Sequence, residues 1–210
     1  MSSDRNREFG NNDVEITARN HVYRGHIRVD AYRLRHRRHA GGWTGEMNRE
    51  LVERGHAVAV LPYDPVLDQV VLIEQFRIGA YAAERTPWQI EIVAGIIEAG
   101  EAPEDVARRE CVEECGCRIE ALVHVCDILT SPGVLSETMA IYCGRTDSSA
   151  AGGVHGLVDE HEDIRAIALA AETAFAWLDQ GRILNCPAII ALQWLLRGRE
   201  RIRRDWDNGG

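Results

Sequence analysis

Apolar and polar residues alternate along the first quarter of the chain, as they do in short, half-exposed strands. The alternation is clearest over residues 27–32, which read IRVDAY. Successive side chains of a strand point to opposite faces, so a period of two predicts β-structure. We therefore expect a small antiparallel β domain over residues 13–50, preceded by a disordered polar segment, residues 1–12.

The rest of the chain carries longer apolar runs, which predict one larger domain over residues 51–203 with a short tail, residues 204–210. Strands are expected at residues 56–65, 69–77, 88–94, 119–129, 138–143 and 164–169, and helices at 103–114, 170–180 and 187–203. Residues 144–163 are polar and rich in glycine, and they predict a loop. Loops of this length in a compact domain are usually functional or disordered.

The two C-terminal helices carry apolar stripes at helical spacing. Phe175 and Leu178 mark the first stripe, and Ile190, Leu192 and Leu196 mark the second. Such stripes are most simply explained by helices that face a hydrophobic core.

Length and charge exclude several classes of protein. A chain of 210 residues suffices for one sizeable domain with an appendage. A net charge of −9 argues against a nucleic-acid partner. No apolar run approaches the ~20 residues that span a membrane, and the polar N-terminus lacks an apolar signal core. We expect a cytoplasmic protein with no nucleic-acid or membrane partner, whose six cysteines stay reduced.

Two features leave alternatives open. A zinc site built from Cys111, Cys115 and Cys117 is conceivable, but no second Cys/His pair with finger spacing follows them. The basic run over residues 33–40, RLRHRRHA, is interpreted as an exposed strand edge or turn in preference to a phosphate-binding segment.

Three glutamates of the expected helix 103–114 carry the strongest chemical signal. Glu110, Glu113 and Glu114 are spaced i, i+3 and i+4, which places them on one face. Their charges repel one another and lie in the last turns, where the helix dipole disfavours negative charge. A hard divalent cation, above all Mg²⁺, would relieve both conflicts. The alternative is an exposed acidic helix.

The residues around these glutamates agree with a helix. Pro103 suits the first helical turn, and Gly116 stands where a left-handed C-cap is expected. Ala107 and Cys111 are four residues apart and would pack inward. Gly95 has no side chain, so its backbone could approach a metal ion or a phosphate closely.

The segment over residues 95–117 resembles the Nudix box, G-x5-E-x7-R-E-U-x-E-E-x-G-U. Its charged and glycine positions are filled by Gly95, Glu101, Arg109, Glu110, Glu113, Glu114 and Gly116. Cys111 and Cys117 stand where the pattern has bulky aliphatic residues. The resemblance implies a Nudix hydrolase with a fold of the α/β (α+β) class: a mixed β-sheet sandwiched between helices, with a small N-terminal antiparallel β domain.

Beyond the box, the chain is similar to the bacterial ADP-ribose pyrophosphatase subfamily over nearly its whole length. The matching segments include NDVEI, YRG, LPYDPV, VVLIEQFRIGAY, HGLVDEHEDIR and ALQWL. In that subfamily a proline beyond the box marks ADP-ribose preference, and Pro132 fills its place. The resemblance implies hydrolysis of ADP-ribose to AMP and ribose 5-phosphate with Mg²⁺, or Mn²⁺ as a substitute. It also implies a homodimer with exchanged N-terminal strands.

Carried over position by position, the resemblance implies the roles of single residues. The Ala94 carbonyl, Glu110, Glu114 and Glu162 would hold Mg²⁺, and Glu160 would accept a proton. From the residues of the box themselves, Glu113 is the third candidate ligand after Glu110 and Glu114, and Glu113 and Arg109 are counted among the catalytic residues. The substrate would be contacted by His26, Arg49, Glu50, Arg54, Arg77, Ile96, Ser131, Pro132, Gly133 and Glu137. From charge alone, the loop that carries Glu160 and Glu162 would be interpreted as solvated.

Three of these positions have further chemical interest. Arg109 is expected to orient Glu101 or Glu113 through a two-pronged hydrogen bond, and Arg77 offers a guanidinium that matches phosphate oxygens. His26 stands where close relatives place an aromatic ring that stacks on adenine, so we expect weaker stacking.

Two alternatives remain: a hydrolase of another nucleoside-diphosphate sugar such as GDP-mannose, and a non-catalytic ADP-ribose sensor. All the box glutamates are present, which disfavours the sensor.

Overall fold

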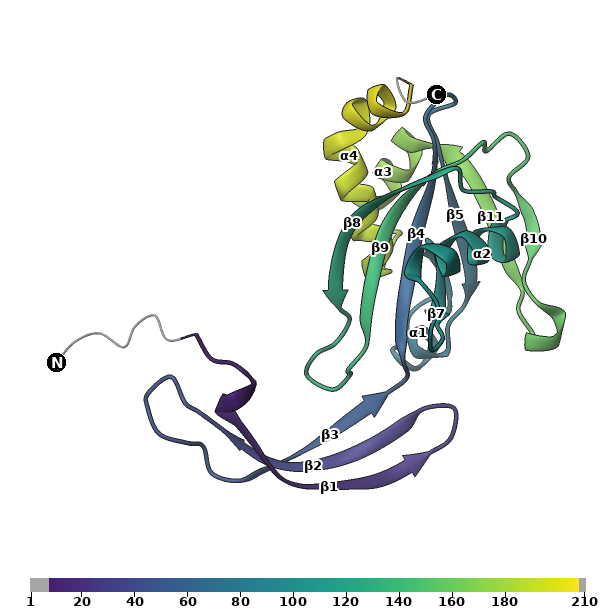
Figure 1. Cartoon of the computed structure of the whole chain (residues 1–210). Coiled ribbons are helices and arrows are strands. Elements are labelled where there is room, and N and C mark those ends of the chain that lie inside the picture. Colours follow the sequence, from purple (N-terminus) through teal and green to yellow (C-terminus); the bar gives the residue numbers. More distant parts are fainter. Residues whose placement is uncertain (1–7, 208–210) are drawn as a thin grey trace. The chain divides into compact units, whose positions relative to one another are not determined.

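The computed structural model describes residues 8–207, which form two compact units (Figure 1). An N-terminal unit comprises residues 8–55 together with Leu129–Glu137, and a C-terminal unit comprises His56–Ile128 and residues 138–207. Residues 1–7, which belong to the segment expected to be disordered, lie outside the described part of the chain. Asn11 and Asn12, the last two residues of that expected segment, are ordered and form a turn of 3-10 helix, η1 (Asn11–Asp13), with Asp13.

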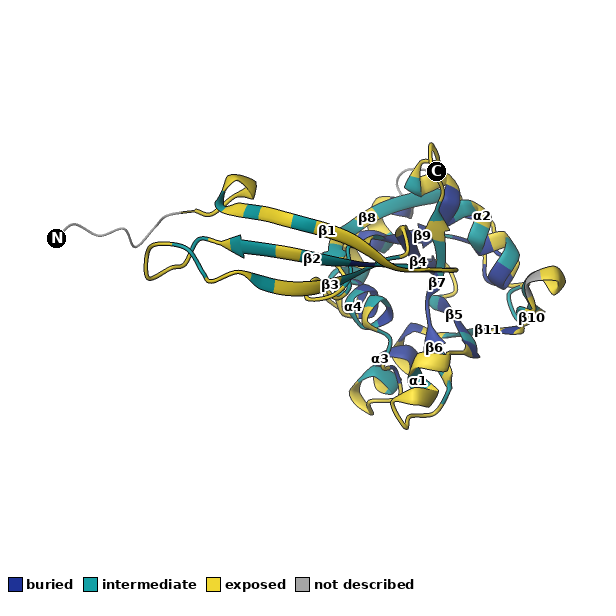
Figure 2. Cartoon of the chain, turned by 90° about the horizontal axis from the view of Figure 1, so that it is seen from below, coloured by how far each residue is buried: buried dark blue, intermediate teal, exposed yellow. Residues whose placement is uncertain are grey.

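The N-terminal unit is a three-stranded antiparallel sheet, as the alternation predicted. Strands β1 (Val14–Arg24), β2 (Arg28–His36) and β3 (Met47–Glu53) lie in the order β1-β2-β3. Most residues of β1 and β3 are exposed or half-exposed (Figure 2). The basic run over residues 33–40 lies at the end of β2 and in the turn after it, where Arg35 pairs with Glu15 across the sheet at 2.7 Å.

The C-terminal unit is built on a mixed β-sheet. Its strands are β4 (His56–Asp64), β5 (Gln69–Phe76), β6 (Trp88–Glu91), β7 (Val93–Ile97), β8 (Ala121–Leu129), β9 (Thr138–Arg145), β10 (Gly153–His155) and β11 (Ile164–Ala170). The order is β10-β11-β5-β4-β9-β8, with β6 beside β5 and β7 beside β4. Strand β4 runs parallel to β9 and antiparallel to β5 and β7.

Helices cover both faces of this sheet, as expected for the Nudix fold. They are α1 (Ile78–Ala82), α2 (Pro103–Cys115), α3 (Ala171–Asp179) and α4 (Cys186–Asp207) (Figure 1). A hydrophobic core lies on each face of the sheet. Alternate residues of β4 belong to one core or the other, because successive strand side chains point to opposite faces. Val58 and Val60 pack with α2 residues, whereas Ala59 and Leu61 pack with residues of α3 and α4.

The structure corrects several expected elements. Helix α1 follows β5 and was not predicted, because five residues are too few to show a helical period. The loop expected over residues 144–163 contains β10 and a turn of 3-10 helix, η2 (Val158–Glu160). Strand β10 has no strand-like pattern and exists because it pairs with β11. Helix α4 continues through Asp207, past the expected end at residue 203.

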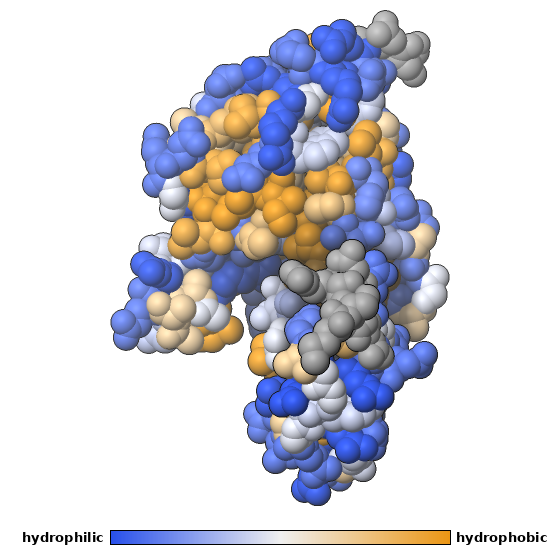
Figure 3. Space-filling view, turned by 90° about the vertical axis from the view of Figure 1, so that its left-hand side faces the viewer, coloured by the Kyte–Doolittle hydropathy of each residue, from blue (hydrophilic) through white to orange (hydrophobic). Residues whose placement is uncertain are grey.

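The apolar stripes expected on the two C-terminal helices are buried or partly buried, except at one position. Phe175 and Leu192 are buried, but Leu196 is 50% exposed. Figure 3 shows apolar side chains on the face that carries α4 and β8, where Ile128 and Ile189 are partly buried against the core. Within residues 8–207, no helix is both long enough and apolar enough to cross a membrane.

Candidate functional site

Helix α2 holds the acidic residues in place, and its ends are built as the sequence predicted. Pro103 occupies the first turn, and Gly116 closes the helix in the left-handed conformation with φ 70°. The Gly116 N–H donates to the Val112 carbonyl at 3.1 Å. Ala107 and Cys111 are fully buried, so this face of the helix is anchored against the sheet.

Strand β7 meets the acidic face of α2. A Cβ atom added at Gly95 would lie 2.2 Å from Glu110 Oε1, so only glycine lets the strand approach this carboxylate. One residue earlier, the Ala94 N–H donates a 3.1 Å hydrogen bond to Glu114 Oε2. Two carboxylates one helical turn apart are thus fixed against neighbouring residues of one strand.

Burial changes the protonation of this pair. Glu114 is 4% exposed, and burial raises its pKa to about 8, although the Ala94 N–H acts in the opposite direction. Burial also raises the pKa of Glu110 to about 7, against the lowering effect of Arg109. The negative charge of Glu162 raises both pKa values further. Buried carboxylates that repel one another favour a bound cation.

Arg109 lies beside three carboxylates of the box. Its Nη1 donates to Glu110 Oε1 at 2.9 Å and lies 3.5 Å from Glu113 Oε2. Its Nη2 lies 3.6 Å from Glu101 Oε1. The expected two-pronged hydrogen bond to Glu101 or Glu113 is therefore wrong, although both carboxylates lie within ion-pair distance of Arg109. The hydrogen bond goes to Glu110, and the guanidinium offsets the charge of all three.

Arg77 is held by an acid that the sequence reasoning missed. Its Nη2 lies 2.7 Å from Glu91 Oε2, and its Nε lies 3.1 Å from the same oxygen. Glu91 is 5% exposed and also accepts a 3.4 Å hydrogen bond from Gln75. Burial lowers the pKa of Arg77, but Glu91, Glu114 and Glu162 together raise it above its usual value. An acid inside the apolar run WQIEIVA was the available signal, because buried carboxylates require partners.

The acidic loop brings one of its two candidate glutamates to the site. Glu162 Oε2 accepts a 3.0 Å hydrogen bond from the Leu157 N–H. A Cβ atom at Gly156, where φ is 106°, would lie 2.6 Å from the Glu162 Cβ, so this turn also requires glycine. The backbone of Glu160 belongs to η2, but its side chain lies outside the described part of the structure. Its role as proton acceptor stays a prediction.

The predicted substrate residues are divided between the two units. Arg77 and Ile96 lie in the C-terminal unit, close in sequence to the metal candidates. The N-terminal unit carries the others: His26, Arg49, Glu50, Arg54, Ser131, Pro132, Gly133 and Glu137. Within that unit, Arg54 Nε lies 3.1 Å from Glu137 Oε1, and Glu137 is 4% exposed.

Glu110 and Glu114 fit a divalent cation on several grounds. They offer oxygen donors, their charges repel, and the glycine at position 95 lets the backbone of β7 approach Glu110 closely. Among the residues whose side chains are described, no three His, Cys, Asp or Glu lie together as a ready-made metal group. The alternative zinc site has no support, because Cys111, Cys115 and Cys117 are buried as free thiols in the core.

Comparison with known proteins identifies a domain that includes the box. The model of the NUDIX domain matches residues 53–170. ADP-ribose pyrophosphatase of Escherichia coli strain K12 is 50% identical over 94% of this chain and 95% of its own. The Haemophilus influenzae enzyme of that name is 40% identical over 95% and 94%.

Two more distant matches complete the comparison. GDP-mannose pyrophosphatase of Cronobacter sakazakii is 33% identical over 71% of this chain and 78% of its own. A solved structure titled "Crystal structure of ADP compounds hydrolase" superposes with a TM-score of 0.67 at 20% identity, covering 94% and 95% of the two chains, which supports the fold. With its box assembled on α2 and β7, this chain belongs to the Nudix family.

Proposed function

We propose that this chain hydrolyses the pyrophosphate of ADP-ribose, giving AMP and ribose 5-phosphate, with a divalent metal ion. The observation that carries the proposal is a pair of mutually repelling carboxylates, the half-buried Glu110 and the buried Glu114, which pack against Gly95 and Ala94. Nudix hydrolases generally use a divalent metal. The choice of ADP-ribose rests on the relatives of that name, which are 40% to 50% identical over nearly the whole chain.

Glu110, Glu114, Glu162 and the Ala94 carbonyl would hold Mg²⁺, with Mn²⁺ as a substitute. When bound, the metal supplies an acidified water and neutralises phosphate charge. Arg109 holds the Glu110 carboxylate at 2.9 Å and so limits its rotation. Glu160 would accept the proton of the attacking water. Glu113 is the third candidate ligand of the box, and its Oε2 lies 3.5 Å from Arg109 Nη1.

Arg77 is the leading phosphate contact of the C-terminal unit. Its guanidinium is pinned on one edge by Glu91, so less side-chain entropy is lost when the remaining edge binds an anion. The residues of the N-terminal unit would bind adenosine and the terminal ribose, with His26 as a smaller stacking surface than an aromatic ring. We propose a cytoplasmic homodimer with exchanged N-terminal strands and with no nucleic-acid or membrane partner.

A substrate panel tests the proposal. The protein is assayed with ADP-ribose, GDP-mannose and other nucleoside-diphosphate sugars in Mg²⁺, and the products are separated and identified. We expect the highest kcat/KM with ADP-ribose, and AMP and ribose 5-phosphate in equal amounts. Repeating the assay after chelation, and then with Mg²⁺ or Mn²⁺ restored, tests the metal. No turnover of ADP-ribose in either metal would contradict the proposal.

A second candidate is hydrolysis of GDP-mannose, which is favoured by the 33% identity to an enzyme of that name. A kcat/KM higher for GDP-mannose than for ADP-ribose would select it. A third, from another class, is a sensor that binds ADP-ribose without cleaving it. Calorimetric binding of ADP-ribose with no product formed would select the sensor.

A further inference from the structure

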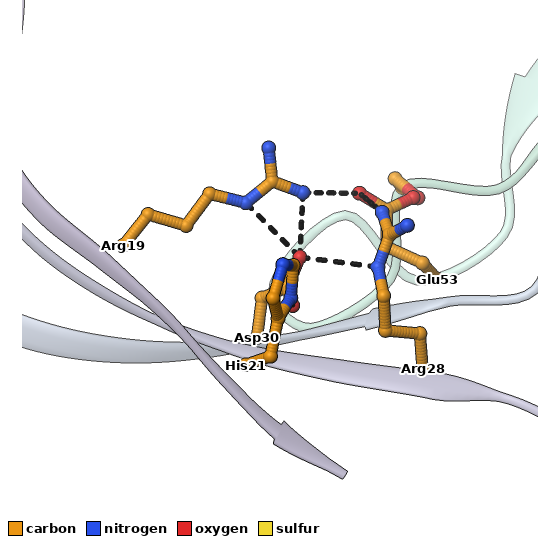
Figure 4. Close-up of polar contacts among 6 residues, drawn as sticks. Arg19, His21, Arg28, Asp30 and Glu53 are labelled. Atoms are coloured by element: carbon orange, nitrogen blue, oxygen red, sulfur yellow. Dashed lines mark hydrogen bonds and ion pairs between the residues drawn. The ribbon is translucent and has the colours of Figure 1, made fainter. Parts of the chain in front are cut away.

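A charged cluster crosses the three strands of the N-terminal unit (Figure 4). At its centre Asp30 of β2 is 0% exposed and accepts from Arg19 Nε at 3.0 Å. Arg19 binds Asp30 Oδ2, and Arg28 Nε lies 3.3 Å from the same oxygen. His21 Nδ1 lies 2.5 Å from Asp30 Oδ1. The Arg19 hydrogen bond is the main cause that lowers the pKa of Asp30 to about 2. The cluster therefore keeps its buried negative charge at neutral pH.

Glu53 connects this cluster to a loop. It is the last residue of β3, and its Oε1 lies 3.5 Å from Arg28 Nη2 and 3.9 Å from Arg19 Nη2 (Figure 4). Its other oxygen, Oε2, accepts a hydrogen bond from the Ser136 hydroxyl. One carboxylate thus joins two arginines of the sheet to the loop Leu129–Glu137.

The backbone of this loop is fastened to the same end of β3. The Val52 N–H donates to the Val134 carbonyl at 2.8 Å, and the Ser136 N–H donates to the Val52 carbonyl at 3.3 Å. Just beyond, Arg54 pairs with the buried Glu137. The loop connects β8 to β9 of the C-terminal unit, yet its contacts place it in the N-terminal unit.

The loop is fixed at its base and open at its tip. Glu137 is buried, whereas residues 131–134 are exposed. The Ser131 carbonyl accepts from the N–H groups of Val134, at 3.0 Å, and Leu135, at 2.8 Å, which closes the tip into a tight turn. The exposed turn carries three of the predicted substrate contacts, so its placement would set how a sugar diphosphate is received.

We propose that Glu53 is a positioning residue for substrate recognition: through Ser136 it holds the loop Leu129–Glu137 in its binding conformation, and it ties that loop to the Arg19–Asp30–Arg28 cluster. This rests on the proposed function, because the loop matters only if its tip contacts a sugar nucleotide. The metal candidates belong to the other unit. Loss of the tie therefore weakens substrate binding and leaves the chemical step intact.

Four variants of the full-length protein test this role: Glu53→Ala, Ser136→Ala, the double variant and the conservative Glu53→Gln. The matched control is Glu15→Ala, which removes a 2.7 Å ion pair with Arg35 in the same sheet but touches no loop residue. Steady-state kinetics are measured with the sugar nucleotide that the wild type cleaves fastest. Hydrogen exchange of the amides of residues 134–136 is followed in parallel.

We expect Glu53→Ala and Ser136→Ala each to raise KM about tenfold, the effect of losing one hydrogen bond to a charged group, with kcat within about twofold. The double variant should be no worse than either single one, because both remove the same bond. Glu53→Gln should recover part of the loss, since its carbonyl still accepts from Ser136. Exchange over residues 134–136 should speed up in the alanine variants and stay unchanged in Glu15→Ala.

A KM that changes no more in Glu53→Ala and Ser136→Ala than in Glu15→Ala would overturn the proposal, as would a fall in kcat with KM unchanged. Ser136→Ala removes a single oxygen, so it keeps the test valid if Glu53→Ala fails to fold. A wild type that cleaves no sugar nucleotide would contradict the proposed function as well. An active wild type with an unchanged KM in the variants would contradict only the role of Glu53.

Discussion

Gly95 and Glu110 meet where strand β7 faces helix α2, and their contact leaves no space for a side chain on the strand. The carboxylate of Glu110 occupies the position where a Cβ atom at residue 95 would stand. The glycine that opens the box therefore serves packing between two elements of the fold. The same approach desolvates Glu110, and burial is the first cause of its raised pKa.

Replacing that glycine tests the contact. Gly95→Ala should displace Glu110, because its Cβ would come within 2.2 Å of Glu110 Oε1. We expect turnover to fall at least about tenfold and the apparent affinity for Mg²⁺ to weaken, with a loss of stability of about 1–3 kcal/mol from overpacking. Kinetics against Mg²⁺ concentration and urea unfolding are the measurements. Gly79→Ala is the control, since no atom lies within 4 Å of a Cβ there; equal effects in both variants would refute the explanation.

The raised pKa values predict a pH dependence of stability without metal. The pKa of Glu110 rises from 4.5 to about 7 and that of Glu114 from 4.5 to about 8, so folding favours their protonated forms. Their contribution to stability is complete below about pH 4.5 and is lost as pH rises through about 7 to 8. In chelator, the melting temperature of the wild type should therefore fall from about pH 5 to about pH 8 more steeply than that of Glu114→Gln.

The same variant separates stability from function. Glu114→Gln resembles the protonated carboxyl that folding favours, without a change in size, so its metal-free stability at neutral pH should equal or exceed that of the wild type. Its turnover should fall by orders of magnitude, since a metal ligand is lost. Glu172→Gln, at a side chain that is 69% exposed, should retain the pH slope of the wild type. Full activity of Glu114→Gln in Mg²⁺ would refute its assignment as a ligand.

At the scale of elements, the site depends on a helix and a strand that approach closely and on a loop anchored beside them. Helix α2 is fixed by its caps and by its buried face, so its glutamates have little freedom. The loop over residues 153–163 is anchored by β10 and by the contact of Gly156 with Glu162. Glu162 therefore has a defined place, whereas Glu160 lies one turn away in η2.

This arrangement predicts that substitutions of the two loop glutamates change the kinetics in different ways. Glu162→Gln should lose less turnover and should be partly rescued by added Mg²⁺, because removal of a ligand weakens metal binding. Glu160→Gln should lose turnover with little change in substrate affinity and no rescue, because removal of a base slows the chemical step. Titration of kcat and KM with Mg²⁺ distinguishes them. The opposite pattern would exchange the two roles.

At the scale of the whole molecule, residues distant in sequence are sorted into two units, and the sorting does not follow chain order. The loop Leu129–Glu137 belongs with the N-terminal sheet, although both of its ends enter the C-terminal unit. The predicted metal ligands occupy one unit and most predicted substrate contacts the other. Activity on a sugar nucleotide should therefore require both units.

Deletion of residues 14–50 tests this requirement. We expect the remaining chain to retain the core of the C-terminal unit, because the two core clusters are built from residues of α2, α3, α4 and the strands of that unit. Hydrolysis of ADP-ribose should be lost, and the oligomeric state should fall from dimer to monomer. Light scattering, circular dichroism and the activity assay together report the outcome. A monomeric truncated protein with full activity would refute the swapped dimer and the substrate role of this segment.

The sequence by itself determined the local structure of the site. The helix over residues 103–114, its proline start and its glycine cap follow from short-range chemistry, and all are present in the structure. The alternation over the first strands and the buried face marked by Ala107 and Cys111 are local periodicities, so they too could be predicted. The mixed sheet between helices followed from resemblance to the Nudix family.

Only the tertiary structure decided which residues meet. The bond from Arg109 to Glu110, the pairing of Arg77 with Glu91 and the tie from Glu53 to Ser136 depend on side-chain directions and on long-range packing. Strand β10 forms because β11 lies beside it, and Leu196 is exposed although α4 is still buried beyond it, at Ile202 and Trp206. Arg77 and Glu91 are 14 positions apart and Glu53 and Ser136 are 83 apart, so no local pattern encodes these pairings. Arg109 and Glu110 are neighbours in the chain, and their bond depends on the directions of the two side chains. Gly95 shows both contributions. The sequence places a glycine at the start of the box, but only the fold shows that the Glu110 carboxylate occupies the position of a Cβ atom there.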